Sequence, residues 1–257
     1  KSSLLILFGM AMWLPAYQQN MDVLQVDKLK SELANATADS SQALLLTQLA
    51  EAYRDRITDT SFYYGQKALE LSRRINYPTG ESKALSALSY YFFNKGDLPR
   101  ALELGLEALA IARKQGTRYD QAFAMIRVGN VYMNLGDYRE ALRYYHNTRR
   151  LTENTEETFF YAVTFWRAAD AYQSLKMTDS ALYNAKIAED LAHKMGNRFI
   201  IRSIAPTLGA AYAETGKDQL ALKYLHMNKG VFGSAALAVF HKNHGTYDSA
   251  KYYAHNS

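Results

Sequence analysis

Residues 128–145 read VGNVYMNLGDYREALRYY and contain the pattern that decides the fold. The small residue Gly129 is followed three positions later by an aromatic residue, then by Gly-Asp at 136–137 and by Ala-Leu at 141–142. Residues three apart lie on one face of a helix, and glycine adopts turn conformations that bulkier residues resist. The stretch therefore predicts two helices joined by a tight turn.

The same pattern recurs along the chain. Its small residue lies at positions 50, 89, 129, 169, 209 and 238, so five spacings of 39, 40, 40, 40 and 29 residues separate six copies. A single hairpin cannot bury its apolar stripe, and neighbouring hairpins must stack around a shared core. The sequence predicts an all-α, right-handed superhelical solenoid of antiparallel helical hairpins, with about six units over residues 41–257.

Local details of the array follow from the same alignment. Asp97 and Asp137 are predicted to cap the helices that follow them, with Pro99 in the first turn of its helix. Pro206 would lie inside a helix that begins near Arg198, which predicts a kink or a later start. The helix that begins near Gln219 meets Asn228-Lys229-Gly230 early, so the last two units are expected to stack irregularly.

The composition limits the classes of function. There are 30 Lys+Arg against 25 Asp+Glu, a net charge of +5, with 48% hydrophobic residues and no cysteine. This balance is typical of a folded protein, and the missing cysteines exclude disulfides, thiolate metal sites and thiolate nucleophiles. Basic pairs such as Arg73-Arg74 lie near predicted helix ends, where cations complement the negative terminus. No nucleic-acid partner is expected, because no compact basic face with interleaved aromatic residues is visible.

The first residues resemble an export signal. Lys1 precedes an apolar run from Ser3 to Ala16, which is shorter than the roughly 20 residues that a membrane-spanning helix needs. We interpret 1–19 as a signal-peptide-like segment, either cleaved or kept as an anchor. The expected location is exported, periplasmic or membrane-anchored facing the periplasm. Residues 20–40 are predicted to form a capping helix, Met21 to Asn35, and a linker, and the array is expected to continue beyond Ser257.

The order of small residue, aromatic residue, turn glycine and Ala-Leu resembles the tetratricopeptide repeat family from about residue 41 onward. The usual repeat has about 34 residues, so spacings near 40 indicate helices about three residues longer each. The resemblance implies a concave groove, lined by the first helix of each hairpin, that binds a protein or peptide. The combination of a signal-like start, a capping helix and lengthened repeats also resembles the extracytoplasmic sensor region of bacterial two-component sensor kinases.

The predicted groove residues lie three or four apart on the first helices, opposite the packed small residues. Large apolar side chains exposed together usually mark a partner site. The same side chains could instead fill the space between neighbouring hairpins. The predicted site consists of Tyr90, Phe93, Phe123, Ile126, Asn130, Met133, Trp166, Asp170 and Gln173.

Asn130 and Trp166 are the strongest candidates in this set. Asn130 matches the groove asparagine with which such repeats hold a peptide backbone or terminal carboxylate, as the resemblance implies. The chaperone-type carboxylate clamp also needs a lysine one turn earlier, where this chain has Ile126. Binding of chaperone tails is therefore not expected.

No catalytic, cofactor or metal site is predicted. His241 and His244 lie three apart, with His255 further on, but zinc needs three or four converging ligands. The adjacent acidic pairs Glu156-Glu157 and Glu189-Asp190 point to different sides of a helix, so they make no acid/base couple. Neither a glycine-rich phosphate loop nor a Gly-x-Ser-x-Gly turn is present.

The sequence predicts a non-catalytic scaffold whose ligand is a protein or peptide in the concave groove. We interpret it as the sensory part of an envelope sensor kinase or related signalling protein, in which ligand binding changes the curvature of the superhelix. Any kinase domain would lie beyond Ser257, and membrane contact would come only through a further anchor or an uncleaved signal. The alternatives are a stand-alone exported scaffold for assembling envelope complexes and a cytoplasmic peptide-responsive regulator.

Overall fold

The computed structural model describes residues 25–54, 58–156, 158–227 and 231–255, and every regular element within these ranges is an α-helix. The signal-like segment 1–19 and the first residues of the predicted capping helix lie outside the described residues. A helix covers 25–35, and its Val26 and Leu29 are buried together with Leu49. No helix of the described part is long and apolar enough to cross a membrane.

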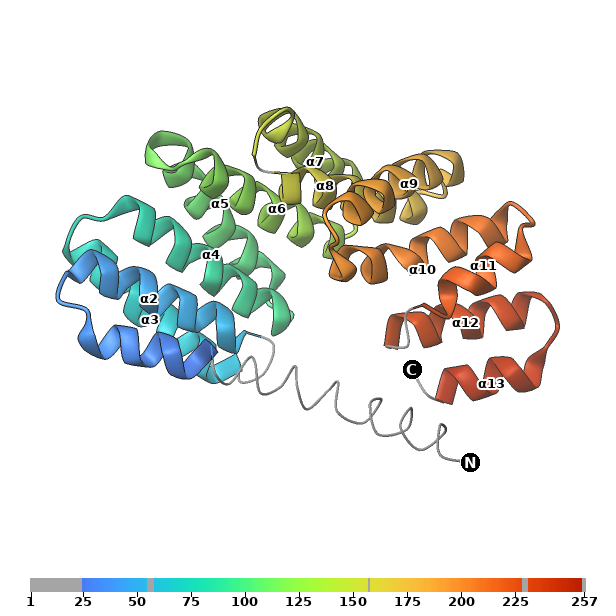
Figure 1. The fold of residues 1–257 in the computed structure, drawn as a ribbon, viewed down its shortest axis with the longest axis horizontal. Helices are drawn as coiled ribbons and strands as arrows, with labels where there is room; N and C mark the ends of the chain where they lie inside the picture. The colour runs from blue at the N-terminus through green and yellow to red at the C-terminus, as the bar shows by residue number, and fades with distance from the viewer. Residues whose placement is uncertain (1–24, 55–57, 157, 228–230, 256–257) are drawn as a thin grey trace, which may run out of the picture. The chain divides into compact units, whose positions relative to one another are not determined.

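The chain divides into two compact units, residues 1–120 and 121–257. In the first unit, each second helix runs antiparallel to the helix before it, and α4 packs against α2, α3 and α5 (Figure 1). The two hairpins therefore share one core. Their helices are α2 (Asp39–Tyr53), α3 (Thr58–Arg74), α4 (Pro78–Asn94) and α5 (Leu98–Gln115).

The second unit begins within α6 and continues the same arrangement. Within it, α8 packs against α10 and α10 against α12, so the first helices of successive hairpins form one layer. The predicted all-α stack of antiparallel hairpins is confirmed. The helices are α6 (Arg118–Asn134), α7 (Tyr138–Thr152), α8 (Thr158–Ser174), α9 (Thr178–Lys194), α10 (Arg198–Glu214), α11 (Asp218–Leu225), α12 (Val231–Asn243) and α13 (Tyr247–His255).

The small residue of each hairpin marks a close approach of its two helices. A Cβ atom on Gly129 would lie 2.6 Å from Cε1 of Tyr145, and one on Gly209 would lie 2.5 Å from Cδ2 of Leu225. Neither position has room for a larger side chain. The turn after α6 also needs its glycine, because Gly136 has a φ of +80°, in the region that favours glycine.

The helix ends follow the predicted signals. Oδ1 of Asp97 accepts a hydrogen bond from the backbone N–H of Arg100 at 3.2 Å, and Oδ1 of Asp137 accepts one from Glu140 at 3.1 Å. Pro99 lies in the first turn of α5. These three predictions are confirmed.

Pro206 lies inside α10, which starts at Arg198, so of the two predicted alternatives the later start does not occur and the kink stays a prediction. The physical reason is the cap: Oδ1 of Asn197 accepts a hydrogen bond from the backbone N–H of Ile200 at 3.1 Å and fixes the helix start well before the proline. The predicted early end of the helix near Gln219 is observed, because α11 has only eight residues and stops at Leu225.

Candidate functional site

The candidate site is the surface that the first helices α6, α8 and α10 of the second unit share. Residues at steps of three and four lie on one side of α6. Adding 40 to their numbers gives the matching residues on α8, and adding 80 gives those on α10. We call this surface the first-helix face. Its members are Phe123, Ile126, Asn130 and Met133 on α6, Val163, Trp166, Asp170 and Gln173 on α8, and Ser203, Pro206, Ala210 and Ala213 on α10, with Phe159 and Phe199 four residues before Val163 and Ser203.

The other two predicted residues belong to the first unit. Tyr90 and Phe93 are half-buried on α4, with stacked rings whose centroids lie 6.0 Å apart. The guanidinium of Arg54 lies 5.3 Å from the centroid of the Tyr90 ring. These two residues form a separate aromatic pair of the first unit.

Burial divides the predicted residues of the second unit. Ile126 is 8% exposed and Trp166 is 7% exposed, and both belong to the hydrophobic core. The prediction that water reaches these two side chains is wrong, because neighbouring groups cover them. The ring of Phe199 lies 5.8 Å from that of Trp166, and the guanidinium of Arg167 lies 4.0 Å from the Trp166 ring. The half-buried members are Phe123, Asn130, Met133, Asp170 and Gln173.

Asn130 is held by the second helix of its own hairpin. The hydroxyl of Tyr145 on α7 donates a hydrogen bond to Oδ1 of Asn130 at 2.9 Å. Burial raises the pKa of Tyr145 far above its usual value, so this phenol stays a hydrogen-bond donor. The NH₂ group of Asn130 makes no hydrogen bond within the described part of the chain and is available to donate.

Asp170 occupies the matching position one hairpin later. Oγ1 of Thr207 on α10 donates a hydrogen bond to Oδ1 of Asp170 at 2.6 Å, and a guanidinium nitrogen of Arg167 lies 3.6 Å from Oδ2. Burial raises the pKa of Asp170 to about 6, against the opposing effects of Arg167 and of hydrogen bonds from Thr207 and Trp166. The carboxylate is therefore mostly ionised at neutral pH and is a strong acceptor.

Gln173 connects α8 to the end of α10. Its Nε2 donates a hydrogen bond to Oε1 of Glu214 at 2.7 Å, while Thr178 donates to the other oxygen of the same carboxylate. Oε1 of Gln173 is buried and accepts no hydrogen bond from any described residue. The face thus carries an unused donor on Asn130, whereas the unused acceptor of Gln173 is buried beneath it.

Two aromatic residues of this face were missed by the sequence analysis. Phe159 is 44% exposed and Phe199 is 62% exposed, and each is the second residue of its helix. They continue the stripes of α8 and α10 toward the helix starts. The signal that could have found them is the 40-residue spacing itself, since Tyr119 precedes Phe159 by 40 residues. They provide the exposed apolar surface that the buried Trp166 does not.

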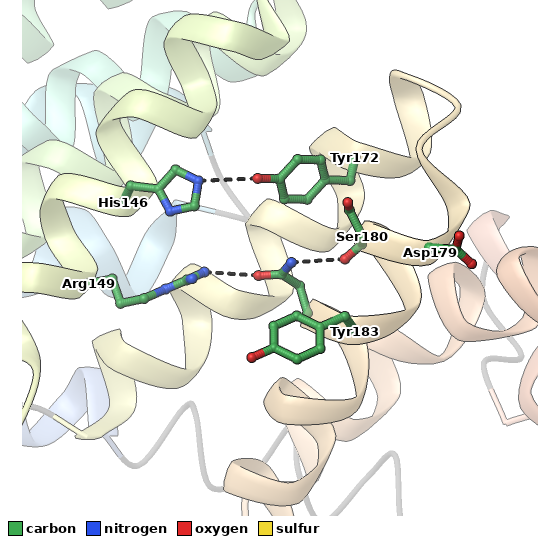
Figure 2. A pocket seen from close by; sticks show the side chains of 7 residues that line it. His146, Arg149, Tyr172, Asp179, Ser180 and Tyr183 are labelled. Carbon is green, nitrogen blue, oxygen red and sulfur yellow. Dashed lines mark hydrogen bonds between the residues drawn. The ribbon is translucent and has the colours of Figure 1, made fainter.

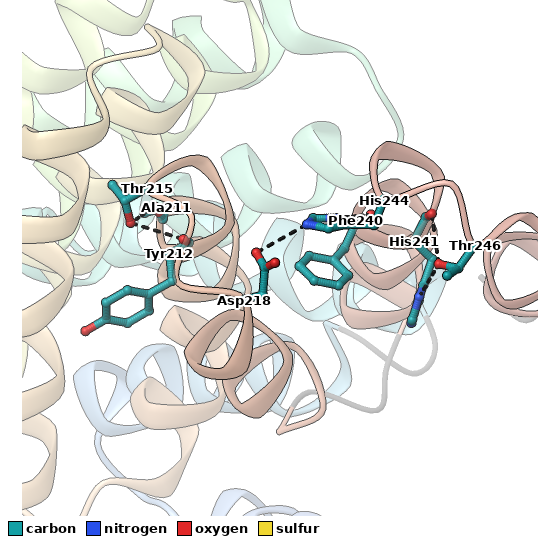
Figure 3. A network of polar contacts seen from close by, with 8 residues as sticks. All are labelled: Ala211, Tyr212, Thr215, Asp218, Phe240, His241, His244 and Thr246. Carbon is teal, nitrogen blue, oxygen red and sulfur yellow. Dashed lines mark hydrogen bonds and ion pairs between the residues drawn. The ribbon is translucent and has the colours of Figure 1, made fainter.

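The histidines near the end of the chain form hydrogen bonds with their neighbours instead of converging on one point. Nε2 of His244 lies 3.2 Å from Oδ1 of Asp218, and its Nδ1 lies 2.8 Å from the carbonyl oxygen of Phe240 (Figure 3). Nδ1 of His241 lies 2.9 Å from Oγ1 of Thr246. Among the described residues, no three His, Cys, Asp or Glu side chains are placed to hold a metal ion.

Residues 124–156 match the family model of the tetratricopeptide repeat. The matched residues run from within α6 to just past the end of α7, so this similarity covers one hairpin of the stack. Over 126 residues the chain is 25% identical to tetratricopeptide repeat protein 29 of Trypanosoma brucei brucei, which covers 48% of this chain and 26% of that protein. Over 167 residues it is 23% identical to the 43 kDa receptor-associated protein of the synapse of Tetronarce californica. That alignment covers 63% of this chain and 40% of the relative. The chain therefore spans less than half the length of both relatives.

Several solved structures share the fold. A Rap protein in complex with Competence and Sporulation Factor superposes with a TM-score of 0.72 at 17% identity, over 94% of this chain and 71% of that one. Aspartyl phosphate phosphatase F from Bacillus subtilis gives a TM-score of 0.70 at 12% identity, over 91% of this chain and 66% of that one. A signal transduction ATPase with a tetratricopeptide repeat sensor from Pyrococcus horikoshii gives 0.63 at 16%, over 96% and 40%. At these identities the likeness concerns the fold alone.

Proposed function

We propose that the chain is a non-catalytic binding scaffold whose first-helix face holds an extended peptide or protein segment. The observation that carries this proposal is the pair Asn130 and Asp170, 40 residues apart on successive first helices. One offers an unused N–H donor and the other a carboxylate acceptor. A peptide backbone presents one donor and one acceptor per residue, so such a pair suits an extended chain. The exposed rings of Phe159 and Phe199 would contact its apolar side chains.

The role that we propose for this scaffold is sensory, within an envelope signalling protein. Two proteins of the same fold support a sensory role: one was solved with Competence and Sporulation Factor, and another has a tetratricopeptide repeat sensor. The export-like residues 1–19 favour an extracytoplasmic location. In this proposal, ligand binding shifts the arrangement of the hairpins and thereby signals to an attached segment.

The binding site can be tested with Asn130→Asp. This change keeps an oxygen that accepts the Tyr145 hydroxyl but replaces the NH₂ donor with a second acceptor. Peptides are selected on the wild-type chain from a phage-displayed random library, and their affinities are measured by fluorescence polarisation. We expect Asn130→Asp to weaken the selected peptides about tenfold, the effect of roughly 1.4 kcal/mol.

Asn134→Asp is the matched control, because Asn134 is exposed one turn further along α6 and, among the described residues, its side chain donates to the backbone carbonyl of Asn130 and to no side chain. It introduces the same charge on the same helix. Equal weakening by both variants, or a library from which no peptide is enriched, would contradict the proposed site.

The location is tested separately by fusing residues 1–19 to alkaline phosphatase lacking its own signal. That reporter folds only where its disulfides form, outside the cytoplasm. High activity in intact cells supports export. An inactive fusion would favour the cytoplasmic regulator, and an active fusion on a chain without any signalling output would favour the exported scaffold.

A further inference from the structure

A pocket of about 400 Å³ lies in the second unit, outside the first-helix face. It is formed by one side of α7, the first turns of α9 and one side chain of α8 (Figure 2). None of its residues was singled out as a binding residue by the repeat pattern. The lining consists of His146, Arg149, Tyr172, Asp179, Ser180, Tyr183 and Asn184.

Arg149 is the cationic residue of this pocket, and among the described residues no carboxylate forms an ion pair with it, although Glu153 acts on its pKa electrostatically. Its only hydrogen bond in the described part of the chain is a 3.1 Å bond to Oδ1 of Asn184. One face of the guanidinium covers the ring of Phe165, with 3.5 Å between Cζ and the ring centroid. Its Nε is buried without a hydrogen-bond partner among the described residues. Burial lowers the pKa of Arg149, as expected for a cation that is partly desolvated and unpaired.

The other donors approach the same space from different helices. His146 lies one turn before Arg149 on α7, and its Nε2 is 3.3 Å from the hydroxyl of Tyr172 on α8. Figure 2 shows Tyr183 and Ser180 of α9 on the other side of the pocket. Burial, Arg149 and Arg150 all lower the pKa of His146. A lowered pKa favours the neutral imidazole, which keeps one N–H that can donate a hydrogen bond.

We propose that this pocket binds the phosphoryl group of a small phosphate monoester. Arg149 would pair with the phosphoryl oxygens, His146 and Ser180 would donate hydrogen bonds to them, and the exposed ring of Tyr183 would contact the organic part. Three donor side chains from two helices, α7 and α9, suit the several acceptor oxygens of a tetrahedral oxyanion, whereas a planar carboxylate would use only the arginine fork. The volume falls in the range of small-ligand sites, about 300–1,000 Å³, and leaves room for an organic group.

Asp179 is the single acidic residue of the lining. Its side chain is exposed and points away from Arg149 in Figure 2. It makes no ion pair with Arg149, so it does not supply the missing partner. A carboxylate at the rim opposes anion binding, and its removal is expected to strengthen binding.

The probes are phenyl phosphate, inorganic phosphate, benzoate and phenol, each titrated into the full chain by isothermal calorimetry. Phenyl phosphate should bind most tightly, inorganic phosphate more weakly, and benzoate and phenol weakest. Arg149→Gln should weaken phenyl phosphate about tenfold or more, since charge-assisted hydrogen bonds to the phosphoryl group are lost. Asp179→Asn should strengthen it.

Arg150→Gln is the matched control. Arg150 is the next residue on α7, is exposed, bonds to Oδ1 of Asn147 and does not line the pocket. It removes the same charge from the same helix. The affinity for phenyl phosphate should stay within about twofold of the wild-type value, because salt screens the long-range attraction between Arg150 and the ligand. Asn130→Asp should also bind phenyl phosphate as the wild type does, which separates this site from the peptide site.

Three outcomes would overturn the proposal: no binding of phenyl phosphate, equal losses in the Arg149 and Arg150 variants, or benzoate binding as tightly as phenyl phosphate. Circular dichroism checks that each variant is folded. If Arg149→Gln does not fold, Arg149→Lys keeps the charge but loses the fork, and it should still weaken binding. The Asp179→Asn variant tests the proposal independently of folding, because Asp179 is exposed at the rim. Its affinity for phenyl phosphate should rise, and an unchanged or lower affinity would also contradict the site.

Discussion

At the residue scale, the two helices of a hairpin meet at a pair of positions 16 residues apart, and the sizes of the two side chains compensate. Gly129 faces Tyr145 and Gly209 faces Leu225, so a large side chain meets a residue without one. The corresponding pair in the hairpin between them is Ala169 and Ala185, and both are fully buried. Close packing inside the unit therefore accommodates a glycine opposite a large side chain, or two alanines opposite each other. A large side chain opposite an alanine would be overpacked.

Gly129→Ala should destabilise the second unit by about 1–3 kcal/mol, the usual cost of overpacking a core. The new Cβ would lie 2.6 Å from Cε1 of Tyr145, and moving that ring would break its hydrogen bond to Asn130. Urea denaturation measures the change in the free energy of unfolding. In a background with Tyr145→Ala, which copies the Ala169 and Ala185 pair, the same substitution should cost much less. An identical cost in both backgrounds would show that the two positions are not coupled.

The candidate site was predictable at this scale only in part. Repeat spacing located Asn130 and Asp170, because matching positions on successive helices need only a count along the sequence. It did not predict that Trp166 is covered, since the cover comes from Phe199 of the following hairpin and from the direction taken by Arg167. Whether an apolar side chain on such a face is exposed depends on its neighbours in space, which the period does not specify.

At the scale of the element, local signals determined several helix boundaries. Side-chain caps and turn glycines placed the starts of α5 and α7, and the sequence was sufficient to predict them. The turn before α9 has Lys176 at a φ of +60° where other turns have glycine, so stacking of the neighbouring hairpins overrides a local cost of about 1 kcal/mol. Pro206 within α10 is a second case in which packing outweighs a local preference.

The ion pair between Asp218, at the start of α11, and His244, just after the end of α12, requires a protonated His244. The Phe240 carbonyl and Asp218 raise the pKa of His244, while burial together with His226 and His244 lowers the pKa of His241 (Figure 3). Because the folded pKa of His244 is raised, its stabilising contribution is fully present below about 6.5, the unfolded value, and is lost as the pH rises through the folded value.

An NMR titration of the histidine side chains checks this assignment. His244 should titrate above about 6.5 and His241 below it. Asp218→Asn should lower the pKa of His244, because its ion-pair partner is removed. Asp248→Asn removes an exposed acid of α13 and is the matched control. Titration of both histidines at the same pH, or an Asp218→Asn variant in which His244 does not move, would refute the pairing.

At the scale of the whole molecule, stability in a helical-repeat chain is a sum of hairpin and nearest-neighbour contributions. The first unit has buried clusters of its own, such as Leu49 with Val26 and Leu29. The second has a larger one that includes Ile204. The number of hairpins and their order follow from the 40-residue period, but the division at residue 120 does not, because the period is the same on both sides of it.

We therefore expect the two units to open separately. Leu49→Ala and Ile204→Ala form a matched pair, since both side chains are fully buried, and each should destabilise its own unit by about 2–5 kcal/mol. Native-state hydrogen exchange followed by mass spectrometry should show Leu49→Ala lowering the protection of α2–α4 and leaving α8–α11 unchanged, with the opposite result for Ile204→Ala. The reason is that a lost core contact raises the population of open forms only in those helices that pack around the same core. Loss of protection along the entire chain in both variants would mean that the hairpins unfold as one cooperative body and that the two clusters are energetically one core.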